Sequence, residues 1–138
     1  MLQINELQID NFVKCKVSND AGIYKILSID GYNLKVILNG ARQGEWHNLD
    51  KIKPIKLTSE ILEKCGFEKY IDNSDDLTYY TMKLNDEKKC ELALSSGDKN
   101  GICEVTLSPY EDYFRYQYLH QIQNIYFSIT QKELLINI

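Results

Sequence analysis

Apolar and polar residues alternate with a period of two along much of the N-terminal third of the chain. Residues 12–17 and 34–38 follow this alternation, and residues 23–29 are rich in β-branched side chains. Two further short segments, residues 45–49 and 51–55, have the composition of strands. A period of two is typical of a strand with one buried face. The pattern therefore predicts four or five short strands.

Two turn dipeptides separate these strands. Asp30-Gly31 and Asn39-Gly40 are typical of tight hairpin turns, because glycine tolerates a positive φ. Parallel strands need a long crossover, usually a helix, and no segment of helical length separates these strands. The sequence therefore predicts a small SH3-like antiparallel β-barrel over residues 1–53.

A short helix is predicted directly after this module, over residues 58–65. Thr58 can cap its N-terminus. Leu57 and Leu62 have the spacing of a hydrophobic staple across the first turn. Gly66 can end the helix, because glycine readily adopts the left-handed conformation.

The remaining sequence predicts an α+β domain over residues 57–138. Three segments between residues 79 and 107 alternate apolar and polar residues, which predicts an antiparallel β-meander with one covered face. Over residues 117–130 apolar side chains recur at helical spacing, which predicts a helix that covers the meander. Its apolar stripe consists of Leu119, Ile122, Ile125, Tyr126 and Ile129. The predicted fold class is therefore α+β.

The charge balance narrows the range of partners. The chain of 138 residues has a formal net charge of −4. Residues 1–56 carry a slight basic excess, and residues 57–138 carry the acidic excess. Nucleic-acid binding over the whole surface is therefore disfavoured. The chain has no long apolar run and no basic, apolar N-terminus, so we expect a cytoplasmic protein that does not engage a membrane.

The cysteines give little indication of a metal or cofactor. Cys15, Cys90 and Cys103 fall on the apolar side of predicted strands, where cysteine behaves as a small hydrophobic residue. No cysteine pair has C-x-x-C spacing, only two histidines are available, and no glycine-rich phosphate loop occurs. We expect buried reduced thiols, no metal and no cofactor, with disulfides or metal ligation as the less favoured alternative.

A first set of candidate binding residues surrounds the segment GEWHN. Arg42, Trp46 and His47 could join Tyr24 and Tyr32 in an aromatic surface, such as small barrels use for peptides or single strands. The alternative is that Trp46 packs in the barrel core and His47 faces solvent. We favour this alternative, because a single tryptophan usually serves packing in a small domain.

A second set lies near the C-terminal helix. Tyr113 and Tyr116 belong to a tyrosine-rich segment, which could form an interface or could edge the core between sheet and helix. His120 and Gln123 lie on the polar face of the helix, which could be a recognition surface or a proton-transfer site. We favour a solvent-facing or hydrogen-bonded histidine, because polar residues on the outer face are the default. No residue has the spacing to His120 that marks a catalytic set.

Two segments carry a resemblance to a known group of proteins. They are IKPIKLTSEILEKCGFEK at residues 52–69 and YLHQIQNIYFSITQKEL at residues 118–134. They resemble uncharacterised small proteins of gut Bacteroidetes and their phages or prophages, in which a β-module leads through an IKPI-LT-E-LLK-GF junction to a VHQLQNLYFALTGKEL-like helix. The chain departs from this pattern at Tyr118 and Ser128, where valine and alanine are usual. The resemblance implies a mobile-element origin and no known activity.

Three functions agree with these observations. The favoured one is a non-catalytic binding or accessory protein with a protein partner, self-association included. The second is a nucleic-acid-associated module that acts through the N-terminal barrel, and a small enzyme is the least favoured. A basic, aromatic surface around Lys35, Arg42 and Trp46 would favour nucleic acid, whereas an exposed apolar patch over residues 110–118 would favour a protein.

Overall fold

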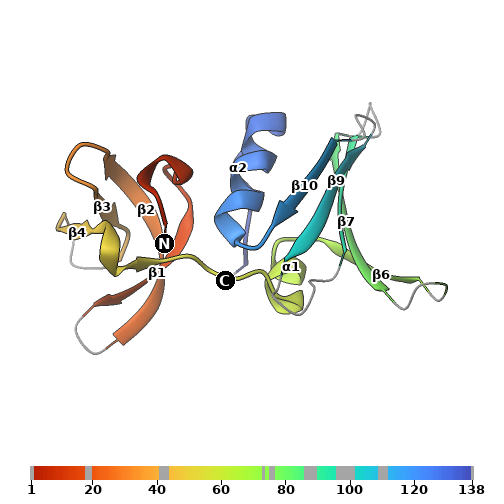
Figure 1. Cartoon of the computed structure of the whole chain (residues 1–138), viewed down its shortest axis with the longest axis horizontal. Helices are drawn as coiled ribbons and strands as arrows, with labels where there is room; N and C mark the ends of the chain where they lie inside the picture. The colour runs from red at the N-terminus through yellow and green to blue at the C-terminus, as the bar shows by residue number, and fades with distance from the viewer. Residues whose placement is uncertain are drawn as a thin grey trace. The chain divides into compact units, whose positions relative to one another are not determined.

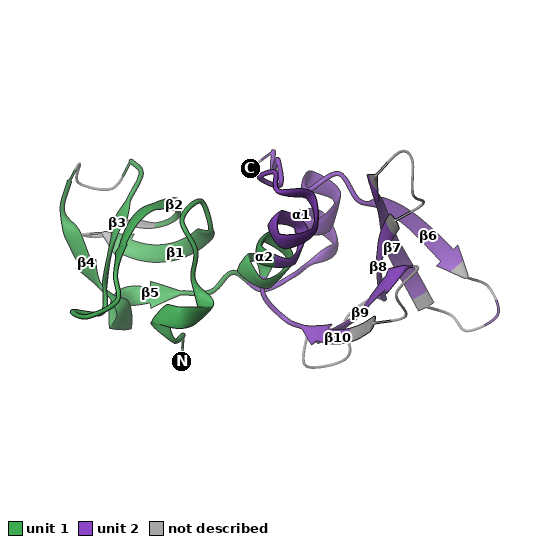
Figure 2. Ribbon diagram, turned by 90° about the horizontal axis from the view of Figure 1, so that it is seen from above, with its two compact units in different colours: residues 1–55, 119–124 green, residues 56–118, 125–138 purple. Residues whose placement is uncertain are grey.

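The chain folds into two compact units, each of which contains one antiparallel sheet of five strands (Figure 1). The first unit comprises residues 1–55 and 119–124, and the second comprises residues 56–118 and 125–138 (Figure 2). The predicted fold class, α+β, is confirmed. The computed structural model describes residues 2–17, 20–40, 44–72, 74, 77–85, 90–95, 102–108 and 112–137.

The sheet of the first unit has the strand order β4-β3-β2-β1-β5. Every neighbouring pair of strands is antiparallel, as the alternating pattern predicted. Its closure into an SH3-like barrel stays a prediction. Two 3-10 turns accompany the sheet, η1 (Ile4–Glu6) and η2 (Leu49–Lys51). The strands are β1 (Phe12–Val17), β2 (Asp20–Asp30), β3 (Lys35–Leu38), β4 (Trp46–Asn48) and β5 (Ile52–Lys53).

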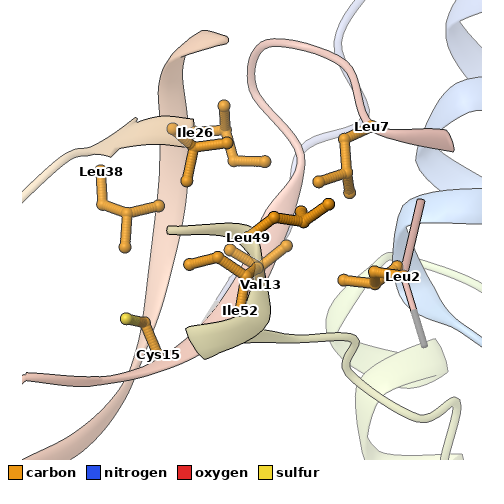
Figure 3. Close-up of a cluster of buried hydrophobic side chains, with 9 residues drawn as sticks. Leu2, Leu7, Val13, Cys15, Ile26, Leu38, Leu49 and Ile52 are labelled. Atoms are coloured by element: carbon orange, nitrogen blue, oxygen red, sulfur yellow. The ribbon is translucent and has the colours of Figure 1, made fainter. Parts of the chain in front are cut away.

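Alternate strand residues form the core of the first unit. In β1, Val13 and Cys15 are buried, whereas Lys14 and Lys16 are exposed, because successive side chains point to opposite faces of a sheet. Cys15 is a free thiol and packs as an apolar side chain. Figure 3 shows the buried cluster, which consists of Leu2, Leu7, Val13, Cys15, Ile26, Val36, Leu38, Leu49 and Ile52.

The sequence predicted that Gly31 stabilises the turn after β2 through a positive φ. The structure shows that it does not. Gly31 does not adopt a positive φ, and Leu34 has a φ of 55° instead. The carboxylate of Asp30 accepts hydrogen bonds from the backbone N–H groups of Tyr32 at 3.1 Å and Asn33 at 3.0 Å. An aspartate side chain therefore stabilises this turn. Leu34 lies within the turn and is exposed, rather than on the buried face of β3.

The sheet of the second unit has the order β10-β9-β8-β7-β6, and its neighbouring strands are antiparallel. The predicted meander corresponds to the three middle strands. The two edge strands, β6 and β10, were missed. Strand β6 exposes both Tyr70 and Ile71, so it lacks the alternation that identifies a strand. The strands are β6 (Glu68–Asp72), β7 (Leu77–Asn85), β8 (Cys90–Ser95), β9 (Cys103–Ser108) and β10 (Asp112–Tyr116).

Helix α1 (Ser59–Lys64) begins and ends where its local sequence predicts. The hydroxyl of Thr58 accepts a hydrogen bond from a backbone N–H of the first turn at 3.2 Å. At the other end, the N–H of Phe67 donates to the carbonyl of Leu62 at 3.1 Å, and Gly66 has a φ of 91°. These are the features of a Schellman motif, which satisfies the last carbonyls of a helix.

Helix α2 (Leu119–Thr130) contains the predicted apolar stripe, of which Leu119 and Ile122 are fully buried. The sequence assigned the whole helix to the second domain. In the structure residues 119–124 belong to the first unit, and only residues 125–130 belong to the second. The start of the helix is bound to the first unit, since the N–H of Leu119 donates to the carbonyl of Ile55 at 2.8 Å.

Replacement of Gly66 with alanine tests the motif that ends α1. A Cβ atom has room there, because the nearest surrounding atom is Cε of Met82 at 3.9 Å. The cost therefore arises from the left-handed backbone, and we expect a loss of about 1–2 kcal/mol in the free energy of unfolding, measured by urea denaturation. Gly31→Ala is the control, because Gly31 has open space and no positive φ. Equal losses in both variants would contradict the assignment.

Candidate functional site

The predicted binding residues lie on three elements. Arg42 and the side chain of Tyr113 lie outside the described part of the chain. The other candidates differ in burial and in their contacts. The described elements carry Trp46 and His47 on β4, Tyr113 and Tyr116 on β10, and His120 and Gln123 on α2.

Gln123 is only 5% exposed and binds the segment that leads into β1. Its Oε1 atom accepts a hydrogen bond from the backbone N–H of Phe12 at 2.9 Å. Its Nε2 atom donates to the backbone carbonyl of Asp10 at 3.0 Å. Because a backbone N–H can only donate and a carbonyl can only accept, these two partners fix the orientation of the amide. Gln123 therefore satisfies two backbone groups at the start of the first strand.

Asn124 extends this interaction to the preceding residues. Its Oδ1 atom accepts from Nδ2 of Asn11 at 2.7 Å, and its Nδ2 atom donates to the carbonyl of Glu6 at 3.0 Å. Asn11 is itself buried, and its Oδ1 atom accepts from the backbone N–H of Gln8 at 2.8 Å. Gln123 and Asn124 on the polar face of α2 are thus bound within the first unit. The expectation that this face is directed outwards is wrong for Gln123, which is buried.

His120 lies in the first turn of α2 and is 1% exposed. It does not face solvent, which corrects the solvent-facing alternative. Burial lowers the pKa of its imidazole, because a buried cation loses hydration, and the carboxylate of Glu6 opposes this effect to a smaller extent. His120 therefore packs within the first unit and does not present a surface for recognition.

Trp46 and His47 occupy the opposite faces from those we favoured. His47 pairs with Val36, which is fully buried, and Trp46 pairs with Ile37. Facing residues of antiparallel strands share one side of the sheet, so His47 points towards the core and Trp46 points outwards. Nε2 of His47 is buried and has no hydrogen-bond partner among the described residues. Trp46 is 43% exposed, so it does not pack in the core, and its part in a binding surface stays a prediction.

The two tyrosines that the sequence added to this aromatic surface do not join it. Tyr24 is half-buried and packs against the core cluster of the first unit. Tyr32 is 95% exposed, and it lies in the turn between β2 and β3 rather than on a strand. Of the described aromatic candidates in the N-terminal unit, Trp46 is therefore the one that the sheet presents on its outer face.

Trp46 lies on a face of the first sheet that is rich in lysine. Register places Lys14 between Lys53 of β5 and Ile23 of β2. Nζ of Lys25 lies 5.4 Å from the ring centroid of Phe12, which is a cation–π distance. The sequence showed the alternating lysines of β1, but their proximity to those of the other strands depends on register. We call this surface the lysine face and define it by Phe12, Lys14, Lys16, Lys25, Lys35, Trp46 and Lys53.

One described acidic strand residue shares the lysine face, Asp30. It lies opposite Lys35, and its carboxylate oxygens accept hydrogen bonds from the turn that follows β2. The pKa of this carboxyl group is lowered, mainly by the hydrogen bond that it accepts from the backbone N–H of Asn33. In the sheet register Lys14 lies opposite Ile23 and Lys53, and Lys16 lies opposite Ala21.

Tyr116 lies on the core side of the second sheet. It pairs with Cys103, which is buried, and its ring stacks on that of Phe114 at a centroid distance of 5.7 Å. Burial raises the pKa of its phenol. Tyr116 therefore edges the core, which was one of the two alternatives. The backbone of Tyr113 pairs with Thr106.

The described thiols are poorly suited to chemistry. Cys15, Cys65 and Cys103 are buried thiols outside any disulfide. Burial raises the pKa of Cys65 to about 12, so its thiol stays protonated and unreactive at neutral pH. It lines part of a groove of about 770 Å³ between α1 and residues 135–137. Within the described ranges, no three His, Cys, Asp or Glu side chains are grouped closely enough to hold a metal ion.

The class that these observations define is an α+β protein with two antiparallel sheets. The chain matches no model of a protein family, no curated protein and no solved structure. Its resemblance to phage and prophage proteins therefore stays a prediction. None of the described helices combines the length and the apolar character needed to cross a lipid bilayer.

Gln123→Ala tests the contact between α2 and the start of β1. The change leaves the N–H of Phe12 and the carbonyl of Asp10 without their partner, and we expect a loss of about 1–3 kcal/mol in the free energy of unfolding. Urea denaturation followed by circular dichroism measures it. Gln8→Ala, an exposed glutamine of the same segment, should change stability by less than about 0.5 kcal/mol. If both variants were equally stable, the contact would not be a structural one.

The lowered pKa of His120 predicts a loss of stability in acid. Below the ordinary pKa of 6.5 the unfolded chain binds this proton more readily than the folded chain does. The contribution of neutral His120 is therefore complete above about pH 6.5 and decreases as the pH falls towards its lower folded pKa. Urea midpoints at pH 7.5 and 5.5 should differ more for the natural chain than for His120→Gln. An equal pH dependence in both would contradict this role.

Proposed function

We propose that this chain is a non-catalytic binding protein and that its binding surface is the lysine face. The observation that carries the proposal is the gathering of five lysines from four strands on one side of one sheet, beside an exposed tryptophan. Like charges that share a surface repel one another, and a ligand of opposite charge relieves that repulsion. The ligand that fits is a polyanion.

The other predicted binding residues give less support to a partner. His120 and Gln123 are buried, and Tyr116 faces the core side of its sheet. A protein partner that binds through these residues would have to displace packed side chains. Trp46 needs no such rearrangement, because its ring is already exposed on the lysine face. A mobile-element origin, which rests on the sequence resemblance alone, and a cytoplasmic location are also part of this proposal.

We also propose that the first sheet is an SH3-like barrel. Its long strand β2 pairs with β1 through residues 20–25 and with β3 through residues 26–30. The register shifts between Ile26 and Ser28, and such irregularities bend a strand. A bent strand that is shared by two groups of partners supports a strongly curved sheet, and strand order β5-β1-β2-β3-β4 fits a small barrel.

Removal of three lysine charges tests the binding surface. Retention of the full chain on immobilised heparin, a polyanion, is measured as the salt concentration that elutes it. We expect the triple variant Lys14→Ala, Lys16→Ala and Lys53→Ala to elute at clearly lower salt, because fewer counterions are released on binding.

The matched control removes the same charge from the second unit. It is the triple variant Lys69→Ala, Lys83→Ala and Lys132→Ala, whose three lysines are all exposed. This control should elute with the natural chain, and circular dichroism should show that both variants fold. The proposal fails if heparin does not retain the natural chain, or if both variants elute at the same salt concentration.

A further inference from the structure

We infer that the polyanion bound by the lysine face is a single-stranded nucleic acid and that Trp46 is the platform on which a base stacks. This inference rests on the proposed function and adds the class of ligand. Bases stack on exposed aromatic side chains, while lysines act on the phosphates as point charges. The lysine face combines both kinds of group on one sheet surface.

The neighbourhood of Trp46 is suited to stacking. Trp46 pairs with Ile37, and two positions along on the same face Lys35 pairs with Asn48. Residues two positions apart on a strand point to the same side, so a cation and an amide flank the exposed ring. Leu27 is also exposed next to the bulge of β2, which adds apolar surface to this part of the sheet. A base on the ring would bury apolar area and leave its phosphate within reach of Lys35.

The remaining lysines extend this surface along β2. Lys16 faces Ala21 near one end of the strand, and Lys35 faces Asp30 at the other end. Strand β2 has 11 residues, which span at most roughly 35 Å at about 3.3 Å per residue. Single-strand binding modules of small β-folds cover about 4–16 nucleotides. The lysine face is long enough for the lower part of that range.

A single strand fits this surface better than a duplex or an acidic peptide does. In a duplex the base faces are stacked on one another and cannot reach the ring of Trp46. An acidic peptide would use the lysines but would gain little from a planar aromatic ring. The exposed tryptophan therefore favours the single strand, and the other two ligands are outcomes of the test.

The experiment uses the only tryptophan of the chain as its reporter. Titration of the full chain with a 15-nucleotide oligo(dT) should quench the fluorescence of Trp46. The dissociation constant is measured independently from the anisotropy of a labelled oligonucleotide. Binding should weaken with salt, with a slope of about −0.7 in log K against log[salt] for each neutralised phosphate. The triple variant of Lys14, Lys16 and Lys53 should have a smaller slope.

Variants of the ring separate stacking from charge. Trp46→Ala should weaken oligo(dT) binding by roughly 5- to 150-fold, because stacking contributes about 1–3 kcal/mol per base. Trp46→Phe should lose less, since an aromatic face remains. Tyr32→Ala is the matched control, because Tyr32 is 95% exposed in the same unit but lies in a turn, and it should bind as the natural chain does.

The outcomes distinguish this inference from the proposed function. Lysine-dependent retention on heparin without oligo(dT) binding at low salt would overturn the single-strand inference and leave the binding surface in place. Tighter binding of poly-glutamate than of oligo(dT) would overturn it in favour of an acidic protein. Equal binding of a 15-base-pair duplex, or an unchanged affinity in Trp46→Ala, would overturn the stacking role. If the natural chain bound neither oligo(dT) nor heparin, both proposals would be overturned.

Discussion

The hydrogen bonds that join Gln123 and Asn124 with residues 6–12 are the constraint on which the rest of the first unit depends. They hold the backbone of Phe12, the first residue of β1, in one position. The side chains of a strand alternate, so a shift by one residue would exchange its two faces. A fixed start of β1 therefore keeps Val13 in the core and Lys14 on the lysine face.

The same constraint decides which surfaces remain for function. A buried amide that satisfies two backbone groups cannot also bind a ligand without leaving those groups unpaired, at a cost of about 1–3 kcal/mol each. Gln123, which the sequence offered for recognition, is therefore used for the architecture, together with Asn124. Trp46 is the opposite case, because its large ring is exposed on the sheet and not buried in the core. Exposure of a large apolar side chain gives up hydrophobic stabilisation, which is the reason to connect it with binding.

How much the sequence could predict depended on how local the determining interaction is. Thr58, Gly66 and the body of α1 lie within ten residues of one another, so their capping could be identified directly. Gln123 binds a residue 111 positions away, and no local pattern distinguishes such an amide from one that faces water. Trp46 and His47 are adjacent, and only the pairing with β3 decides which of them faces the core. The missed strand β6 is an edge whose exposed Tyr70 and Ile71 erase the alternation.

The net charge of −4 argues against polyanion binding only if charge acts as a sum over the whole molecule. At physiological ionic strength the Debye length is about 8 Å, so an exposed charge influences a ligand mainly within that distance. A phosphate near Lys14 therefore responds to Lys53 on the paired strand more than to an acidic residue many strands away. The sheet register brings Lys14, Lys25 and Lys53 onto neighbouring positions of three adjacent strands, and composition contains no information on register. The relevant quantity is the local potential of the lysine face, which the pairing of β5, β1 and β2 creates.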